Sequence, residues 1–366
     1  MARRDRFAAR RGKLAKKVAG RKLDALLVTT RPNVYYLTGF RGDDSALLVG
    51  MEGAWLLTDS RYTEEAEGVL KGVGLVTRKG SMMMAATRTA RKAGVERLGV
   101  EAATMTLAQR GELDEWRGRM AIIPTKGLVE DLRVRKDASE IAAIRRAIAV
   151  AEEGFRLTVA EIGPGMTERE AVIALERRMQ DLGADAPAFP TICAAGPRAS
   201  LPHAMPTNRR IRPREPVLFD WGARLNMVHS DLTRMVCWDR IPVAFGRHYK
   251  LVLDAQRRAI AALRPGRPAG QIDHIARAYL KAHRHGRHFG HGLGHGIGLE
   301  VHEAPGIRPG QDTVLRSGMV FSVEPGVYLP GRYGVRIEDL ALITPSGHSV
   351  LTSQPKGIES VLAEAL

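Results

Sequence analysis

The sequence predicts two domains, an α/β domain over residues 1–128 and an α+β domain over residues 129–366. Two observations predict this division. In the first third of the chain, short apolar segments alternate with helical patterns, as in α/β folds. Beyond Leu128, runs of helical pattern are set against strands at hairpin spacing, as in α+β folds. A chain of 366 residues is long enough for each domain to bury its own core.

The elements of the first domain follow from apolar periodicity and turn residues. Phe7, Leu14 and Val18 recur at helical spacing. They lead straight into an apolar segment, so we expect a first helix here rather than an Arg-rich transit peptide. Gly- and Asp-rich turns separate the predicted strands. The predicted strands are residues 24–30, 45–49, 54–58 and 98–100, and the predicted helices are residues 61–69 and 83–94.

The second domain begins with two helices that have clear capping signals. Asp137 with Glu140, and Thr167 with Glu170, can each form a capping box ahead of an amphipathic run. Further strands and two further helices follow. The predicted strands are residues 217–221, 227–238, 319–329 and 334–344, and the predicted helices are residues 249–263 and 272–282.

Composition argues against several classes of protein. The formal net charge is +16, but Lys and Arg are spread along the chain and no nucleic-acid-binding motif occurs. We therefore expect a generally basic surface and no specific nucleic-acid partner. No apolar run is long enough to span a membrane. Cys193 and Cys237 are too few for a disulfide framework or a thiolate metal site, and the cytoplasm is the expected location.

Four acidic residues interrupt segments that otherwise have the pattern of apolar strands. Burying several carboxylates together is prohibitive without compensating positive charge, which two divalent cations would supply. Nearby Arg pairs, or carboxylates that face solvent at a sheet edge, are the alternatives. The four residues are Asp220 in PVLFD, Asp231 in VHSDLTRMV, Glu324 in MVFSVEPGVY and Glu338 in GVRIEDLALI.

A Gly- and His-rich segment, GHGLGHGIGLEVHE at residues 290–303, contains His291, His295 and His302. Glycine lets backbone and imidazole approach an ion or substrate closely, and His is the commonest metal ligand near neutral pH. A flexible loop is the alternative, and it is our interpretation of three histidines just upstream, His283, His285 and His288. Four carboxylates with one His form an oxygen-rich set, which favours Mn²⁺, Co²⁺ or Fe²⁺ over a structural zinc site.

On these motifs the second domain resembles the pita-bread metallopeptidases, a family that includes methionine aminopeptidase, aminopeptidase P, prolidase and the metal-free creatinase. The resemblance implies two divalent metal ions, with Mn²⁺ favoured and Co²⁺, Fe²⁺ or Zn²⁺ as alternatives. All five ligand positions of the family are filled, in the expected order. The implied ligands are Asp220 in FDWGA, Asp231 in SDLTR eleven residues later, His295 in GHGIG, Glu324 in SVEPGVY and Glu338 in VRIED.

The first domain places the resemblance in the proline-specific branch of the family. LLVTTRPNVYYLTGF and LLTDSRY are similar to the creatinase/prolidase-type N-terminal domain of aminopeptidase P and prolidase. Arg336 in GVRIED matches that branch, and His203 in LPHA matches the family's substrate-side His. One departure is Val228-His229, where many relatives have an aromatic residue. We expect it to alter the shape of the pocket and not metal binding.

The resemblance implies a peptidase that hydrolyses the bond after an N-terminal residue, with Xaa-Pro peptides favoured and a water shared by two metal ions. Glu324 is the implied general base and acid. His203, His302 and Arg336 are further implied catalytic residues, although His203 and His302 could instead brace loops. His291 and the wall around Phe189 are implied to contact substrate.

The residues alone do not separate prolidase from aminopeptidase P. Small peptides are the expected substrates, and the resemblance implies a homodimer. Two other classes compete with a peptidase. A catalytically inactive pita-bread protein would bind other proteins, but such domains lose metal ligands. A metal-free creatinase-like C–N hydrolase would lack this complete carboxylate set.

Overall fold

The computed structural model describes residues 6–363 and divides into two compact units, Met1–Arg133 and Val134–Leu366. Each unit has its own apolar core. Within the described residues, no helix is both long and apolar enough to cross a membrane.

The first unit is built on a six-stranded mixed sheet in the order β4-β3-β2-β1-β5-β6. β1 pairs antiparallel with β2 and parallel with β5, and apolar residues of the sheet pack against α4. The α/β prediction is confirmed. The strands are β1 (Ala25–Val28), β2 (Ser45–Gly50), β3 (Ala54–Thr58), β4 (Gly74–Thr77), β5 (Arg97–Glu101) and β6 (Ala121–Thr125). The helices are α1 (Arg6–Gly20), α2 (Arg31–Thr38), α3 (Thr63–Val69), α4 (Met82–Lys92), α5 (Leu107–Trp116) and α6 (Glu130–Arg133).

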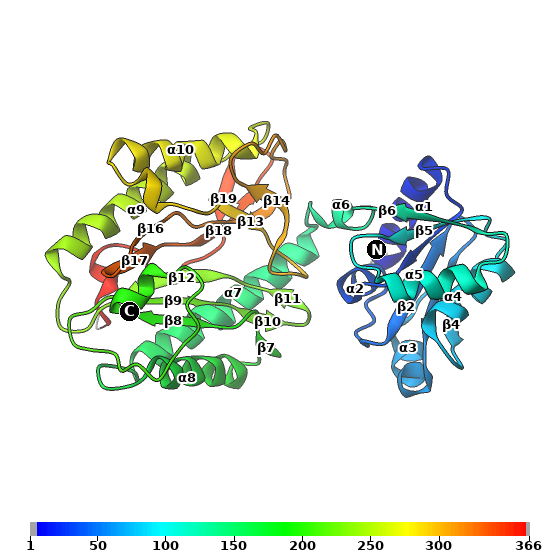
Figure 1. The fold of residues 1–366 in the computed structure, drawn as a ribbon, viewed down its shortest axis with the longest axis horizontal. Helices are drawn as coiled ribbons and strands as arrows, with labels where there is room; N and C mark the ends of the chain where they lie inside the picture. Colours follow the sequence, from blue (N-terminus) through cyan, green and yellow to red (C-terminus); the bar gives the residue numbers. More distant parts are fainter. Residues whose placement is uncertain (1–5, 364–366) are drawn as a thin grey trace. The chain divides into compact units, whose positions relative to one another are not determined.

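Over its described residues, the second unit has four α-helices and several antiparallel sheets (Figure 1). The strand orders are β12-β9-β8, β11-β10-β7, β14-β13-β15-β18-β19 and β16-β17. The helices are α7 (Ala138–Val159), α8 (Glu168–Asp181), α9 (Val243–Ala261) and α10 (Ala269–Ala282). The strands are β7 (Ala186–Pro187), β8 (Ile192–Ala195), β9 (Val217–Trp221), β10 (Ala223–Leu225), β11 (Val228–His229), β12 (Leu232–Val236), β13 (Gly294–Gly296), β14 (Glu303–Ile307), β15 (Val320–Val323), β16 (Gly326–Leu329), β17 (Tyr333–Arg336), β18 (Asp339–Ile343) and β19 (His348–Val350).

Two apolar clusters place the helices on either side of these strands. α7 and α8 pack against one face of β9 through Phe155, Phe219 and Trp221, while α9 and α10 belong to a second cluster that includes the opposite face of β9 and the later strands β15–β18 (Figure 1). Leu218 belongs to the second cluster. Because strand side chains alternate between faces, Asp220 shares the face of Leu218 and points away from α7 and α8. The core therefore aims the first predicted ligand at the interior between the strands.

Three segments predicted as continuous strands are each broken near a predicted metal ligand. β11 and β12 are separated at Asp231, β15 and β16 at Glu324, and β17 and β18 at Glu338. The chain changes partner strands at all three breaks: β11 pairs with β10 whereas β12 pairs with β9, and β15 and β18 belong to the five-stranded sheet whereas β16 and β17 pair with each other. The prediction of unbroken strands was wrong for residues 227–238, 319–329 and 334–344. The carboxylates lie at strand ends, where the chain bends.

Candidate metal centre and active-site pocket

The five predicted ligands come from separate stretches of the chain and line one cavity of about 500 Å³. Asp220 lies in β9 and His295 in β13. Asp231 directly precedes β12, Glu324 directly follows β15, and Glu338 directly precedes β18. The cavity walls also include His203, His291, His302, Arg336 and Phe189, so every residue that the sequence nominated lies in this pocket.

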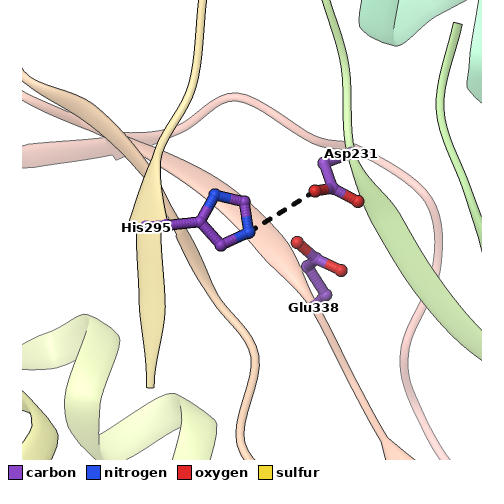
Figure 2. A group of neighbouring side chains, drawn as sticks. All are labelled: Asp231, His295 and Glu338. Atoms are coloured by element: carbon purple, nitrogen blue, oxygen red, sulfur yellow. Dashed lines mark ion pairs between the residues drawn. The ribbon is translucent and has the colours of Figure 1, made fainter. Parts of the chain in front are cut away.

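Asp231, His295 and Glu338 form the tightest group in the pocket. One ligand atom of each lies within 4.8 Å of the others, and Figure 2 shows the three side chains converging from different strands. The His295 Nε2 atom is 3.6 Å from Asp231 Oδ2 and 3.3 Å from Glu324 Oε1. A cation between these atoms would have both nitrogen and oxygen ligands, as metal sites with mixed His and carboxylate ligands do.

Asp220 occupies the neighbouring part of the pocket, beside Arg336. The Arg336 guanidinium donates to Asp220 Oδ2, to Thr233 Oγ1 at 3.0 Å and to the Tyr328 hydroxyl at 2.9 Å. The other oxygen of Asp220, Oδ1, is buried and has no hydrogen-bond partner among the described residues, and the same is true of Glu338 Oε1. Unpaired buried carboxylate oxygens are costly unless a cation binds them. Buried carboxylate oxygens without a protein partner are therefore what a metal site would provide.

The charges in the cluster are unbalanced without a cation. Burial, together with the other carboxylates, raises the pKa of Asp231 and of Glu338 well above the usual values, and burial also raises the pKa of Asp220. Burial opposes the charged form of His295, yet the adjacent Glu324 raises the pKa of His295 to about 9. Burial likewise opposes the charge of Glu324, but His295 lowers the pKa of Glu324 to about 2. In metal-free protein, the raised pKa of His295 favours its protonated form, whose charge offsets part of the negative charge of the cluster.

The histidines of the wall differ in how they are held. His291 Nδ1 lies 2.8 Å from the Gly292 carbonyl oxygen and Nε2 lies 2.9 Å from the Tyr328 hydroxyl. Because a carbonyl only accepts, Nδ1 carries the proton in neutral His291 and Nε2 accepts from Tyr328. The exposed ring of His302 lies 4.3 Å from the His295 ring, centroid to centroid. His291 is therefore fixed by its neighbours, whereas His302 is a solvent-exposed residue of the pocket lining.

Several residues of the site were missed from sequence. Ser322 Oγ donates to Glu324 Oε1 at 3.0 Å and accepts from the His295 backbone N–H, while Thr233 Oγ1 donates to Glu338 Oε2 at 2.8 Å. Ser322 lies two residues before Glu324 and Thr233 two residues after Asp231. Strand alternation from the ligands could have found both. No sequence signal singled out Tyr328.

Arg308 is a further residue that no motif indicated. It lines the cavity and is exposed, and within residues 6–363 its guanidinium makes no hydrogen bond or ion pair. Gly306 pairs with His295 in the β13–β14 ladder, and Arg308 is two residues beyond Gly306, so both share the face of His295. A Cβ added at Gly306 would lie 3.5 Å from Arg308 Nε. The Arg308 side chain therefore lies over Gly306, on the same face as His295.

The departure at Val228-His229 lies outside the pocket wall. Neither residue lines the cavity. His229 is buried, and its backbone N–H donates to the Gly298 carbonyl at 2.9 Å. His229 instead contacts the backbone of the loop that leads to His302, so the expected effect on pocket shape stays a prediction and would act through that loop.

Comparison with known proteins identifies the family to which the chain belongs. Residues 142–345 match the description "Metallopeptidase family M24", and residues 10–135 match "Creatinase/Prolidase N-terminal domain". The chain belongs to metallopeptidase family M24. It is therefore a metallopeptidase, with a creatinase-type N-terminal domain followed by a pita-bread domain, as the resemblance predicted. The family implies divalent metal ions, in agreement with the cluster of Figure 2.

Relatives with names or structures cover almost all of the chain. It is 35% identical over 334 residues to the uncharacterized peptidase YqhT of Bacillus subtilis, covering 91% of this chain and 95% of that protein. It is 34% identical to the Xaa-Pro dipeptidase of Pyrococcus horikoshii, covering 90% and 93%. Among solved structures, the Xaa-Pro dipeptidase from Bacillus anthracis is 34% identical, with a TM-score of 0.93 and coverage of 96% and 99%. The X-Pro aminopeptidase from Thermotoga maritima is 32% identical, with a TM-score of 0.88 and coverage of 95% and 98%.

Proposed function

We propose that this metallopeptidase removes the N-terminal residue from small peptides and favours a proline after the cut. One observation carries the proposal: five nominated ligands from separate stretches of chain line one cavity that contains buried, unpaired carboxylate oxygens. The names of the relatives, Xaa-Pro dipeptidase and X-Pro aminopeptidase, support the substrate class.

The ligand set suits two divalent cations. Asp231, His295 and Glu324 would hold one ion and Asp220 the other, with Asp231 and Glu338 shared between them. Bound there, the ions would polarise the scissile carbonyl and lower the pKa of a water held between them. The oxygen-rich set favours Mn²⁺. A homodimer remains part of the proposal.

The side chains of the pocket would divide the remaining work. Glu324, oriented by the hydroxyl of Ser322, would take a proton from the attacking water and return it to the leaving nitrogen. His203 and His302 would donate hydrogen bonds to the scissile carbonyl as negative charge develops on its oxygen. Both nitrogens of His291 are already bonded, so His291 would shape the wall with its ring rather than donate to substrate.

The cavity also suits a proline ring. Phe189, Pro190, Ile192, Pro202 and Met205 contribute apolar surface to its wall. A proline after the scissile bond has no N–H, and its ring fixes φ near −65°, so the substrate is bent and bulky at this point. An apolar wall next to the carboxylate cluster would accept such a ring while the peptide nitrogen needs no hydrogen-bond acceptor.

Arg308 favours substrates with a free carboxylate close to the scissile bond. Two arginines line the cavity, Arg308 and Arg336. Arg336 is bound to Asp220, whereas the Arg308 guanidinium has no partner among residues 6–363. In a dipeptide the C-terminal carboxylate lies about 4 Å from the scissile carbonyl, roughly one residue away. Arg308 shares the strand face of His295 and would therefore attract the carboxylate of an Xaa-Pro dipeptide.

A substrate panel tests the proposal against its alternatives. Protein stripped of metal and then loaded with Mn²⁺ or Co²⁺ is assayed with Xaa-Pro dipeptides, Xaa-Pro-Yaa tripeptides and Met-Ala-Ser. We expect hydrolysis of the proline peptides only after metal addition. Full activity in thoroughly stripped protein would refute the metal mechanism. Metal binding without hydrolysis of any peptide would favour an inactive binding protein.

A further inference from the structure

The hairpin of α9 and α10 concentrates positive charge that looks evenly spread in the linear sequence. Residues 243–289 contain ten Lys or Arg and two Asp or Glu, which accounts for half of the formal net charge of +16. Six of these cations define what we call the α9–α10 basic face, and all six are exposed. They are Arg247, Lys250, Arg257, Arg258, Lys281 and Arg284.

The four cations of α9 lie on one stripe of the helix. At about 100° per residue, positions 247, 250, 257 and 258 fall within an arc of about 100°. The opposite stripe is buried in the core, through residues such as Phe245, Tyr249 and Val252. Packing of the apolar side thus turns the cationic side outward.

Contacts between the helices join the two groups of cations into one surface. The Tyr279 hydroxyl lies 3.4 Å from Asp254 Oδ2, and the His248 and His285 rings are 4.9 Å apart. These contacts show that the two helices run antiparallel, side by side (Figure 1). His248 follows Arg247 and His285 follows Arg284, so the α10 end of the face lies beside the start of α9.

The cations of this face lack acidic partners. Other exposed arginines pair with a nearby carboxylate, for example Arg110 with Asp114 at 2.8 Å and Arg156 with Glu153 at 2.6 Å. Among the described residues, none of the six cations of the α9–α10 basic face forms an ion pair or donates a side-chain hydrogen bond. Such a row repels itself and is complementary to a polyanion.

The face suits a nucleic-acid backbone better than a membrane. Val243 is the one large exposed hydrophobic residue within 243–289, whereas membrane-surface helices present apolar side chains to the bilayer. The α9 stripe extends about 16 Å from residue 247 to residue 258, the length of several phosphates along one strand. The aromatic ring of Tyr279 lies under Arg258, 4.5 Å from its guanidinium carbon, and is not a free stacking surface for single strands.

We propose that the α9–α10 basic face binds the phosphate backbone of double-stranded nucleic acid without sequence preference. None of its residues lines the peptidase cavity. Binding is therefore separate from peptide hydrolysis, and it depends on salt because phosphate contacts release counterions.

A pair of charge-neutralising variants tests the proposal. Arg257→Gln/Arg258→Gln removes two cations of the face. The control, Arg145→Gln/Arg146→Gln, removes an adjacent exposed pair from α7 with the same change in net charge. Binding of the full-length variants to a labelled 20-base-pair DNA duplex is measured by fluorescence anisotropy from 20 to 150 mM KCl, and Xaa-Pro hydrolysis and Tm check that each variant is folded.

We expect the α9 variant to bind the duplex at least about tenfold more weakly at 50 mM KCl. Its slope of log K against log salt should fall by about two, one for each lost phosphate contact. The α7 control should keep the slope of the wild type. Equal losses in both variants would show a diffuse charge effect and overturn the proposal. So would tighter binding to phosphatidylserine vesicles, or to a single strand, than to the duplex.

Discussion

Glu338 and Asp339 are adjacent in the chain, are both buried, and have opposite electrostatic environments. Asp339 accepts hydrogen bonds from Arg234 at 2.8 Å, from Thr352 at 2.9 Å and from Lys356. Burial opposes its charge, but Arg234 and Lys356 hold the pKa of Asp339 below the usual value. Glu338 receives one hydrogen bond, from Thr233, and burial with the nearby carboxylates raises its pKa well above the usual value.

The difference separates a carboxylate that stabilises the fold from one that is available to a ligand. Asp339 has two cationic partners within the protein, so nothing further is needed to balance its charge. Glu338 shares its pocket with Asp220, Asp231 and Glu324, and its Oε1 is unpaired among the described residues. Glu338 thus lacks the kind of cationic partner that Asp339 has, and a divalent cation would supply it.

Changing the two carboxylates one at a time tests the comparison most directly. Glu338→Gln should lower kcat/KM for an Xaa-Pro dipeptide at least about a thousandfold, as loss of an essential catalytic group does, while the protein stays folded. Asp339→Asn should reduce the free energy of unfolding by about 3–5 kcal/mol, because Arg234 and Lys356 lose a buried partner. Urea unfolding and kcat/KM with saturating Mn²⁺ measure the two effects. Full stability with complete loss of activity in Asp339→Asn would contradict this division of roles.

Glu324 offers the next largest effect, since it is both the proposed base and a proposed metal ligand. Glu324→Gln keeps the size of the side chain but removes its ability to accept a proton, so kcat should fall by about 10²- to 10⁴-fold. Ser322→Ala removes only the hydrogen bond to Glu324 and should have a smaller effect. Near-normal turnover in Glu324→Gln would assign the base to another residue.

The pH dependence of stability should differ between metal-free and metal-loaded protein. The pKa values of Asp231 and Glu338 are raised above their ordinary 3.8 and 4.5, so the stability they contribute is lost as pH rises through the folded values. His295, raised from 6.5 to about 9, acts in the same direction. Glu324, lowered from 4.5 to about 2, acts in the opposite direction only in acid.

We therefore expect the Tm of metal-free protein to fall between pH 5 and pH 9, and bound metal to reduce this slope. Thermal unfolding of stripped and Mn²⁺-loaded samples at pH 5, 7 and 9 measures both. A metal-free protein that is more stable at pH 9 than at pH 5 would show that these carboxylates already have internal partners.

The sequence predicts much of this site because its chemistry is unusual for strands. Carboxylates within apolar segments indicated four of the candidate ligands, whereas the choice of His295 among the histidines of residues 290–303 came from the family resemblance. What it could not indicate was the contrast between Glu338 and Asp339, because Arg234 and Lys356 approach Asp339 from distant parts of the chain. Likewise, the apolar pattern of the sequence predicted unbroken strands across three of the candidate ligands, because that pattern does not show where a chain changes partner strands.

Fold elements with weak local signals were missed for a related reason. β4 is short and half-exposed, so it lacks the apolar run of a buried strand. Helix α9 begins at Val243, six residues before the predicted start, after Pro242, which makes no side-chain capping bond. Both elements are stabilised by tertiary packing more than by their own sequence.

The preference for proline over alanine tests the apolar wall of the pocket separately from the carboxylate cluster. We expect kcat/KM for Xaa-Pro dipeptides to exceed that for Xaa-Ala equivalents at least about tenfold, or roughly 1.4 kcal/mol in transition-state binding. The two series differ in the ring that meets the wall around Phe189 and Pro202. Steady-state kinetics with matched N-terminal residues measures the ratio. A preference for Met-Ala over Met-Pro would place the activity with the methionine aminopeptidases instead.

The smallest expected effect concerns Arg308, which lines the same cavity and has no ion-pair partner among residues 6–363. Arg308→Gln should lower kcat/KM for an Xaa-Pro dipeptide about fivefold, because an exposed ion pair contributes at most about 1 kcal/mol. The same peptide with a C-terminal amide has no carboxylate for Arg308 to attract, so its kcat/KM should change little. Arg332→Gln, which removes another exposed arginine outside the cavity, controls for net charge. Equal losses for the acid and the amide would mean that Arg308 supports the loop after β14 rather than the substrate carboxylate. A loss confined to the acid would support a preference of this pocket for dipeptides over longer chains, whose carboxylates lie farther from the scissile bond.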